Sequence, residues 1–306
     1  MKITYTVECV DKLDTVLRTK LNMSHRVVKE NEKNILVNGK HVLRKDILNI
    51  GDVIQIELNE VIPEKDKFIN KYNCMEQDLD ILYEDEYILA VNKPSNMPVH
   101  PSMENYTNTL SNIVSPYLAK QNIFGVHIIT RLDKDTSGVC IFAKHPYIQE
   151  LFNIQKEKIQ IFKEYFCLVN GIVKEDHGII EQPISRKENS IILREVNELG
   201  KYAKTEYFVK QRNEEKNYTA LKVLLHTGRT HQIRVHMSHI GHTLLGDDLY
   251  AKDVEKNTIL NLIKRQALHC RKISFIHPIT GEKINIYANT PEDIRSLNWH
   301  NHIPVI

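Results

Sequence analysis

The segment "ILYEDEYILAVNKP" (residues 81–94) contains two short apolar runs separated by an acidic turn. Both runs are rich in β-branched and aromatic residues, and Pro94 ends the second, so the segment predicts a strand, a turn and another strand. The same reasoning predicts strands in "VCIFAK" (139–144), "KEYFCLVNG" (163–171), "KTEYFVK" (204–210) and "YTALKVLL" (218–225). We expect these strands to share one sheet.

Helical patterns are fewer in this part of the chain. They cover "NTLSNIVSPYLAK" (108–120), "PYIQELFNIQKEK" (146–158) and "THQIRVHMSHIG" (230–241), where Gly241 suits the position after a helix end. Consecutive strands with occasional helices predict an α+β fold around a largely antiparallel mixed sheet. We assign this domain to residues 79–306.

The first 60 residues predict a separate small module. Apolar side chains from Leu13 to Leu21 recur at the spacing of one buried helical face, and Ser24 can cap a second short helix. The Asn38-Gly39 pair tolerates the positive φ of a type I′ hairpin turn. "VIQIEL" (53–58) alternates like a further strand. The polar residues 61–78 then predict a linker.

The overall composition limits the class of protein. The 306 residues are 42% hydrophobic and 26% charged, with a net charge of +2, so any basic surface must be local. Five scattered cysteines without a CxxC pair exclude zinc ribbons and thioredoxin-like sites and favour a reducing compartment. With neither a signal peptide nor about 18 consecutive apolar residues, the chain is expected to be a cytoplasmic protein.

The segment "RLDKDTSG" (131–138) places Asp133 between Arg131 and Lys134. Nearby cations lower the pKa of a carboxyl group, which suits a nucleophile. The alternative is a solvated turn whose charges cancel. A glycoside hydrolase is a further interpretation, but it needs a second well-placed carboxylate such as Asp135.

The segment "LHTGRTHQIRVHMSHIGHTLLGDDLY" (225–250) contains five histidines together with Arg229 and Arg234. A metal site is one interpretation, but no HExxH pattern occurs and a helix would spread the histidines over more than one face. Packing roles are the alternative. An arginine-bearing turn entering a helix suits contact with an anion. Tyr165 and Phe166 lie on opposite faces of one strand, so one is expected in the core and the other can stack on a ligand ring.

Taken together, these blocks resemble the RluA-type pseudouridine synthases. "NKPSNMPVHP" (92–101) looks like the family's Lys-Pro segment, "RLDKDTSG" its nucleophile loop, "KEYFCLVNG" its tyrosine segment, and "TGRTHQIRVHMSHIGHTLLGDDLY" (227–250) its long C-terminal block. "ALHCRKISFIHPITGEKI" (267–284) is similar to its closing strands. The resemblance covers about residues 80 to 295 in order, and it implies the family's catalytic-domain fold.

The resemblance implies an isomerase that converts specific uridines of large-subunit ribosomal RNA to pseudouridine, without metal or cofactor and as a monomer. Asp133 is then the nucleophile acting on the ribose of a flipped-out nucleotide, Arg234 its ion-pair partner, and Tyr165 the residue that stacks on uracil. Substrate-binding roles fall to Arg131, Arg229, His231 and Lys93.

The N-terminal region resembles a small RNA-binding module, two helices and a hairpin, shared with a ribosomal protein. That resemblance implies phosphate contacts by four basic residues, although a solvated helix face is the alternative for each: Arg18, Lys20, Arg26 and Lys29.

Three positions depart from the family pattern. Thr130 stands where histidine is usual, Asn96 where glycine is common, and Thr243 where proline is usual. Asn96 is tolerable if its backbone is left-handed. Two other functions stay open: the same chemistry on transfer RNA, or a non-catalytic RNA-binding or assembly factor.

Overall fold

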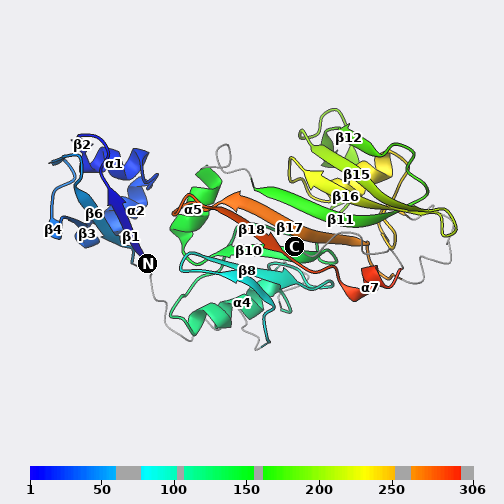
Figure 1. Cartoon of the computed structure of the whole chain (residues 1–306), viewed down its shortest axis with the longest axis horizontal. Helices are drawn as coiled ribbons and strands as arrows, with labels where there is room; N and C mark the ends of the chain where they lie inside the picture. The colour runs from blue at the N-terminus through cyan, green and yellow to red at the C-terminus, as the bar shows by residue number, and fades with distance from the viewer. Residues whose placement is uncertain (60–76, 102–106, 155–160, 252–262, 298–306) are drawn as a thin grey trace.

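The computed structural model describes residues 1–59, 77–101, 107–154, 161–251 and 263–297. A four-stranded sheet and two short helices form within the first 59 residues, and a ten-stranded sheet forms beyond them (Figure 1). The large sheet is mixed, because most pairs are antiparallel and one is parallel. This arrangement confirms the predicted α+β fold. None of the helices in the described residues combines the length and apolarity needed to cross a bilayer.

The large sheet has the order β12-β15-β16-β11-β17-β10-β8-β7, with β18 beside β17 and β9 beside β10. Its strands are β7 (Ile81–Glu84), β8 (Ile88–Lys93), β9 (His127–Ile128), β10 (Ser137–Ala143), β11 (Phe162–Asn170), β12 (His177–Glu181), β15 (Lys204–Asn213), β16 (Tyr218–Leu225), β17 (Leu268–Ile276) and β18 (Lys283–Tyr287). A two-stranded ribbon of β13 (Ile184–Arg186) and β14 (Arg194–Val196) projects beside it. The strands predicted from local alternation form as expected.

The helices of this domain are α4 (Leu110–Ala119), α5 (Pro146–Ile154), α6 (Gln232–His239) and α7 (Glu292–Arg295). Three of them lie where the sequence predicts them, and Gly241 follows α6 with a φ of 84°. The end of the predicted helix 146–158 and most of the predicted linker 61–78 lie outside the described residues.

In the N-terminal region, β1 (Lys2–Thr6), β6 (Val53–Glu57), β3 (Ile35–Val37) and β4 (Lys40–His41) form the small sheet, and β2 (Asp11–Lys12) pairs with β5 (Ile47–Leu48). The helices are α1 (Leu13–Thr19) and α2 (His25–Glu30), followed by the 3₁₀ turn η1 (Glu32–Asn34). Ser24 caps α2 by accepting a hydrogen bond from the backbone of Val27. Asn38 and Gly39 both have positive φ, as the hairpin turn requires.

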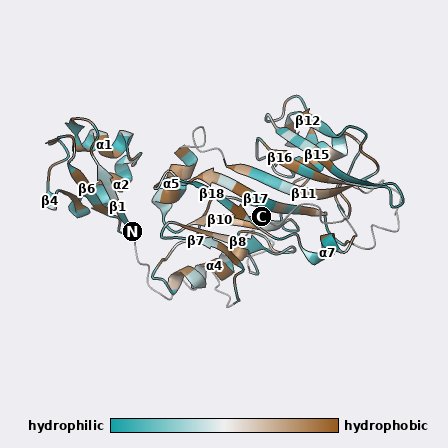
Figure 2. Ribbon diagram, viewed as in Figure 1, coloured by the Kyte–Doolittle hydropathy of each residue, from teal (hydrophilic) through white to brown (hydrophobic). Residues whose placement is uncertain are grey.

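The centre of the large sheet is its most buried part. Every residue of β10 is buried, and Figure 2 shows hydrophobic residues along β10 and its neighbours. Here β10 and β17 run parallel, with Gly138 opposite Cys270. The backbones approach so closely that a Cβ on Gly138 would lie 2.2 Å from the carbonyl oxygen of Cys270, and its φ of +116° also favours glycine. The glycine that ends "RLDKDTSG" therefore fixes where the loop enters the sheet.

One face of this sheet carries both α6 and Tyr165. His236 of α6 hydrogen-bonds the hydroxyl of Thr205 on β15 (2.8 Å). Thr205 lies opposite Leu225, which lies opposite Lys163 on β11, so the three side chains share a face. Tyr165 is two residues beyond Lys163 and points the same way. The loop before β10 and the helix α6 can thus meet over Tyr165.

Candidate active site

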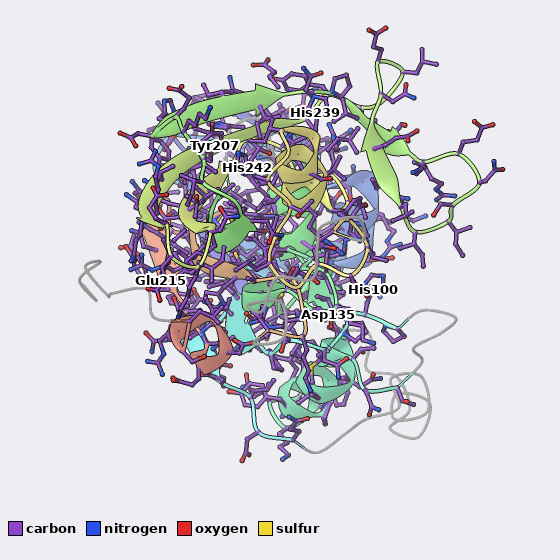
Figure 3. The ribbon with its side chains drawn as sticks, turned by 90° about the vertical axis from the view of Figure 1, so that its right-hand side faces the viewer. His100, Asp135, Tyr207, Glu215, His239 and His242 are labelled. Carbon is purple, nitrogen blue, oxygen red and sulfur yellow. The ribbon has the colours of Figure 1, made fainter. Side chains whose placement is uncertain are left out.

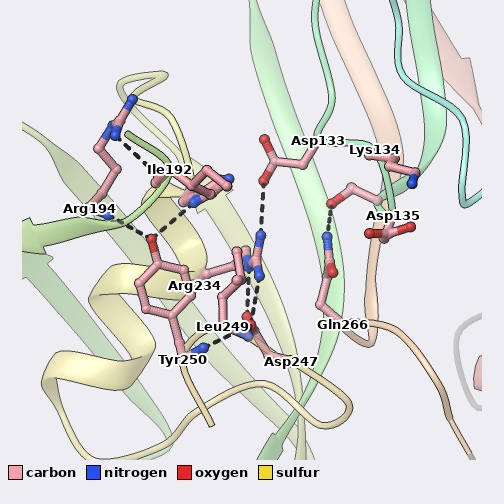
Figure 4. Close-up of polar contacts among 12 residues, drawn as sticks. Asp133, Lys134, Asp135, Ile192, Arg194, Arg234, Asp247, Leu249, Tyr250 and Gln266 are labelled. Carbon is pink, nitrogen blue, oxygen red and sulfur yellow. Dashed lines mark hydrogen bonds and ion pairs between the residues drawn. The ribbon is translucent and has the colours of Figure 1, made fainter. Parts of the chain in front are cut away.

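Asp133 lies in the loop before β10 and faces α6. Its side chain is 29% exposed, and its Oδ2 lies 4.0 Å from Nη1 of Arg234, which is 4% exposed (Figure 4). The two residues are a hundred positions apart in sequence, but the fold brings their charges together. A partly exposed carboxylate beside a buried guanidinium can meet a substrate from solvent while its orientation is restrained.

Arg234 is held by a second carboxylate, Asp247. Its Nε and Nη2 donate to the two Asp247 oxygens at 2.6 Å each, a bidentate geometry that restrains the guanidinium plane. Burial opposes the charge on Arg234, but these hydrogen bonds together with the nearby negative charges of Asp247 and Asp133 outweigh it and raise the pKa of Arg234. The sequence predicted a direct pair with Asp133; the shorter contact is with Asp247, which sequence reasoning missed. The only available signal was the acidic "GDD" after α6.

Tyr165 lies on β11, on the sheet face that carries α6, and is 5% exposed. Burial raises the pKa of Tyr165 well above its usual value, and the nearby Cys270 and Asp133 add to the shift. The phenol is therefore protonated at neutral pH and can donate a hydrogen bond.

His231 and Tyr250 lie on the other side of Arg234. The Tyr250 ring centroid is 5.0 Å from the guanidinium carbon of Arg234. Its hydroxyl is 2.9 Å from Nδ1 of His231 and accepts a hydrogen bond from the backbone N–H of Arg194 at 2.9 Å (Figure 4). His231 has a left-handed backbone (φ 56°) at the start of α6. Tyr250 thus connects the β14 ribbon with the arginine, a role the sequence did not suggest.

Lys93 differs from its expected role in substrate binding. Its side chain is fully buried, and its ammonium group donates to the backbone carbonyls of Pro94, Met97 and Lys134 at 2.7 to 2.8 Å. Burial lowers the pKa of Lys93 to about 8, although Cys140, Asp135 and Asp133 oppose the shift. Since the ammonium already contacts three acceptors away from solvent, Lys93 holds the loop that carries Asp133 rather than facing a ligand.

The other two predicted substrate-binding arginines are exposed. Arg131 projects from the Asp133 loop, and burial together with the Arg131 charge lowers the pKa of His100. Arg229 precedes α6 and donates through Nε to the carbonyl of Tyr202 at 2.9 Å. Both guanidinium groups are therefore accessible to solvent. Arg229 lies just before the N-terminus of α6, and Arg131 lies on the loop that carries Asp133.

The three departures from the family pattern each have a local structure. Asn96 has a φ of 57°, the left-handed backbone in which an asparagine can replace glycine. Thr130 is buried, and its hydroxyl accepts a hydrogen bond from the backbone of Ile141 at 2.9 Å. The Thr243 hydroxyl accepts one from Asn170 at 2.9 Å. Thr130 thus hydrogen-bonds to β10 in the buried interior of the domain, close to the loop that carries Asp133.

The histidines of residues 225–250 separate in space. His226 contacts Glu206, His236 is buried against Thr205, and His242 is 2.9 Å from the carbonyl oxygen of Asn170. Figure 3 shows His239 and His242 near α6, away from the loop that carries Asp135. In the part of the chain that the structure describes, no group of three or more histidine, cysteine or acidic side chains is arranged to hold a metal ion.

The four basic residues predicted to contact phosphates lie on and beside the two N-terminal helices. All four are exposed: Arg18, Lys20, Arg26 and Lys29. Arg26 forms a surface ion pair with Glu30 at 3.3 Å. Their accessibility fits either a solvated helix face or a phosphate-binding surface.

Comparison with known proteins identifies the relatives of this chain. The family model for RNA pseudouridylate synthase matches residues 87–239. "Uncharacterized RNA pseudouridine synthase YjbO" of Bacillus subtilis is 36% identical over 88% of this chain and 91% of its own length. "Ribosomal large subunit pseudouridine synthase D" of Haemophilus influenzae is 38% identical over 72% of this chain and 69% of its own. The solved structure "Human RNA Pseudouridylate Synthase Domain Containing 4" shares the fold, with a TM-score of 0.57, 19% identity, and coverage of 70% and 90%.

Proposed function

The chain belongs to the RNA pseudouridylate synthase family and so isomerises uridine in RNA to pseudouridine, and we propose that it does so in large-subunit ribosomal RNA with Asp133 as the catalytic carboxylate. The family resemblance found in the sequence is confirmed. The observation that carries the residue assignment is the approach of Asp133 to Arg234 at 4.0 Å, over the sheet face that carries Tyr165.

The reaction requires a group that acts on the ribose. The bond from uracil N1 to ribose C1′ breaks, the base turns, and C5 bonds to C1′, while the C5 hydrogen leaves as a proton and N1 takes up a proton. Atoms and electrons balance within the nucleotide, so no oxidant or second substrate is consumed. Asp133 acts on the sugar as the base departs, either by adding to C1′ or by taking the 2′ proton. Its partial exposure permits this contact.

Arg234 keeps that carboxylate oriented. The bidentate pair with Asp247 leaves Nη1 of Arg234 directed at Asp133. Because two hydrogen bonds restrain the guanidinium, the Asp133 oxygen meets the sugar in a narrow range of positions, which is how preorganised groups accelerate reactions. A lysine could not make both bonds at once.

The remaining residues hold the nucleotide. Tyr165 offers a neutral aromatic ring for contact with the uracil. The exposed Arg131 helps to hold the nucleotide turned out of its stack, and Arg229 and His231, at the start of α6, bind the RNA substrate. Turning a nucleotide out costs a few kcal/mol, and least in a loop, so looped RNA is the preferred substrate.

Two observations favour ribosomal RNA. Several relatives that are 34 to 38% identical carry the name of a ribosomal large-subunit pseudouridine synthase. The four exposed basic residues of the N-terminal module add a second surface for phosphates, which a substrate much larger than one stem-loop can reach. The N-terminal module and the catalytic domain then bind the same RNA molecule.

The test is to map pseudouridines across total RNA from cells with and without this protein. We expect one or more large-subunit ribosomal sites to vanish, and to return with the wild-type chain but not with Asp133→Asn. Loss of a transfer RNA site instead would overturn the assignment of substrate. An unchanged map would indicate a non-catalytic RNA-binding factor.

A further inference from the structure

The loop that carries Asp133 is contacted along its length by a segment from far downstream. Arg265 donates through Nη1 to the carbonyl of Asp135 at 3.0 Å. Gln266 donates to the Thr136 hydroxyl at 3.3 Å (Figure 4), and Ser137 hydrogen-bonds the His269 ring at 2.9 Å. Residues 265–269 thus follow residues 135–137 in parallel, up to the start of the β10–β17 pairing at Ser137 and His269.

Arg265 is itself restrained. Its Nε and Nη2 pair with the two oxygens of Asp293 in α7 at 2.6 and 2.9 Å. The residue is 8% exposed, and Nη1 also donates to the carbonyls of Gln266 and Leu268 at 3.2 Å each. A guanidinium fixed by a bidentate pair has little freedom to follow a moving loop, so it holds the Asp135 carbonyl in place.

The same segment contacts the turn that carries Asp247. The backbone of Ala267 donates to the carbonyl of Leu245 at 2.8 Å. At Gly246, directly before Asp247, an added Cβ would lie 2.1 Å from the Arg265 carbonyl oxygen. One short stretch therefore contacts both the loop with the catalytic carboxylate and the turn whose carboxylate holds Arg234.

We propose that Arg265 is a positioning residue for the isomerisation: it sets the distance between Asp133 and Arg234 by fixing the two backbone segments that carry Asp133 and Asp247. This inference rests on the proposed function, since it assigns to Arg265 an effect on the same carboxylate. Arg265 touches no substrate, and its effect is transmitted through the carbonyl two residues beyond Asp133.

The chain offers a matched control in Arg212. This arginine also donates to two backbone carbonyls, of Val173 and Lys174 at 2.7 and 2.9 Å, and to a carboxylate, of Asp176 at 2.6 Å. It lies on β15 and contacts neither the Asp133 loop nor the turn with Asp247. Arg212 thus bonds to the same kinds of group as Arg265, backbone carbonyls and a carboxylate, but with fewer bonds and at a different position.

The experiment compares Arg265→Met, Arg265→Lys, Asp293→Asn and Arg212→Met in the full-length protein. Large-subunit ribosomal RNA from cells lacking the protein, labelled with 5-tritiated uridine, reports turnover as released tritium. For Arg265→Met we expect kcat to fall about 10- to 100-fold, because a displacement of about 1 Å suffices for such a loss. KM is expected to stay within about twofold. Arg265→Lys should recover part of kcat, and Arg212→Met should retain the wild-type value.

Asp293→Asn keeps the proposal testable if Arg265→Met fails to fold, because it leaves the arginine in place and weakens only its anchor. A smaller loss of kcat is expected from it. An unchanged kcat in folded Arg265 or Asp293 variants would overturn the proposal, as would an equal loss in Arg212→Met. Asp133→Asn is measured alongside: if it stays active, the proposed function fails, and if it alone is inactive, only the role of Arg265 fails.

Discussion

The protein carries two groups of basic side chains that differ in their exposure to solvent. At the catalytic loop, Lys93 and Arg234 are buried, and they make three and two short hydrogen bonds, respectively. On the N-terminal helices, Arg18 and Lys20 are exposed. The first group is fixed in geometry, and the second can adapt to any phosphate that comes near.

This difference separates two uses of positive charge. A buried, bidentate cation determines where one carboxylate points, so its loss should reduce the rate of the chemical step. An exposed cation attracts a polyanion over several ångströms and is screened by salt, so its loss should reduce affinity. Variants of the two groups should therefore differ in which kinetic constant they change.

Among the basic residues, the largest effect is expected from the buried Arg234. In Arg234→Lys the positive charge remains, but the paired bonds to Asp247 and the approach to Asp133 cannot both persist. We expect kcat to fall on the order of 10²-fold or more, by analogy with the loss of one preorganised donor. Single-turnover tritium release at saturating RNA measures it. The exposed Arg26→Lys is the control, and an equal effect in both would erase the distinction between the groups.

A smaller effect concerns Lys93 and pH. Its folded pKa of about 8 lies below the 10.5 of the unfolded chain, so the folded state binds fewer protons between these values. The free energy of unfolding contributed by Lys93 therefore rises with pH in that window. Between pH 7.5 and 9.5, the difference in unfolding free energy between wild type and Lys93→Met should change by about 1–2 kcal/mol. Urea denaturation measures this difference.

The matched variant for this measurement is Lys20→Met, since Lys20 is exposed. Its difference from wild type should stay constant over the same pH range. If the Lys93→Met difference is equally constant, the buried ammonium does not titrate as described.

The smallest effect is expected from the exposed group. Replacing both Lys20 and Lys29 with alanine should weaken RNA binding about two- to tenfold at moderate salt, because each lost phosphate contact reduces the slope of log affinity against log salt by somewhat less than one. The rate at saturating RNA should be retained. Binding measured across a salt titration provides the check, and an unchanged slope would make the module a scaffold without phosphate contacts.

The sequence predicted those parts of the fold that depend on local patterns. Alternating β-formers gave the positions of β8, β10, β11, β15 and β16, the left-handed Asn38-Gly39 pair gave the hairpin, and Ser24 gave the start of α2. Each of these features is decided by neighbours in the chain, through side-chain period, turn conformation or capping. The short strands β12 to β14 have weaker alternation and were not predicted.

The sequence predicted less about the site, because its contacts join distant segments. It brought attention to Asp133 and Arg234, but it did not show that Asp247 holds the arginine from beyond a glycine turn. It placed Lys93 in substrate contact, because burial of an ammonium among carbonyls of two loops is not visible in spacing. The contact of Arg265 with the Asp135 carbonyl likewise depends on the pairing of β10 with β17.

The most direct test of the central claim compares wild type and Asp133→Asn, an exchange that keeps the shape of the side chain and removes its charge. RNA affinity and single-turnover tritium release are measured in the same preparation. We expect the release rate to fall on the order of 10⁴-fold, as for other essential catalytic carboxylates, while the Kd for ribosomal RNA stays within about twofold. Release at the wild-type rate would show that Asp133 is not the catalytic carboxylate.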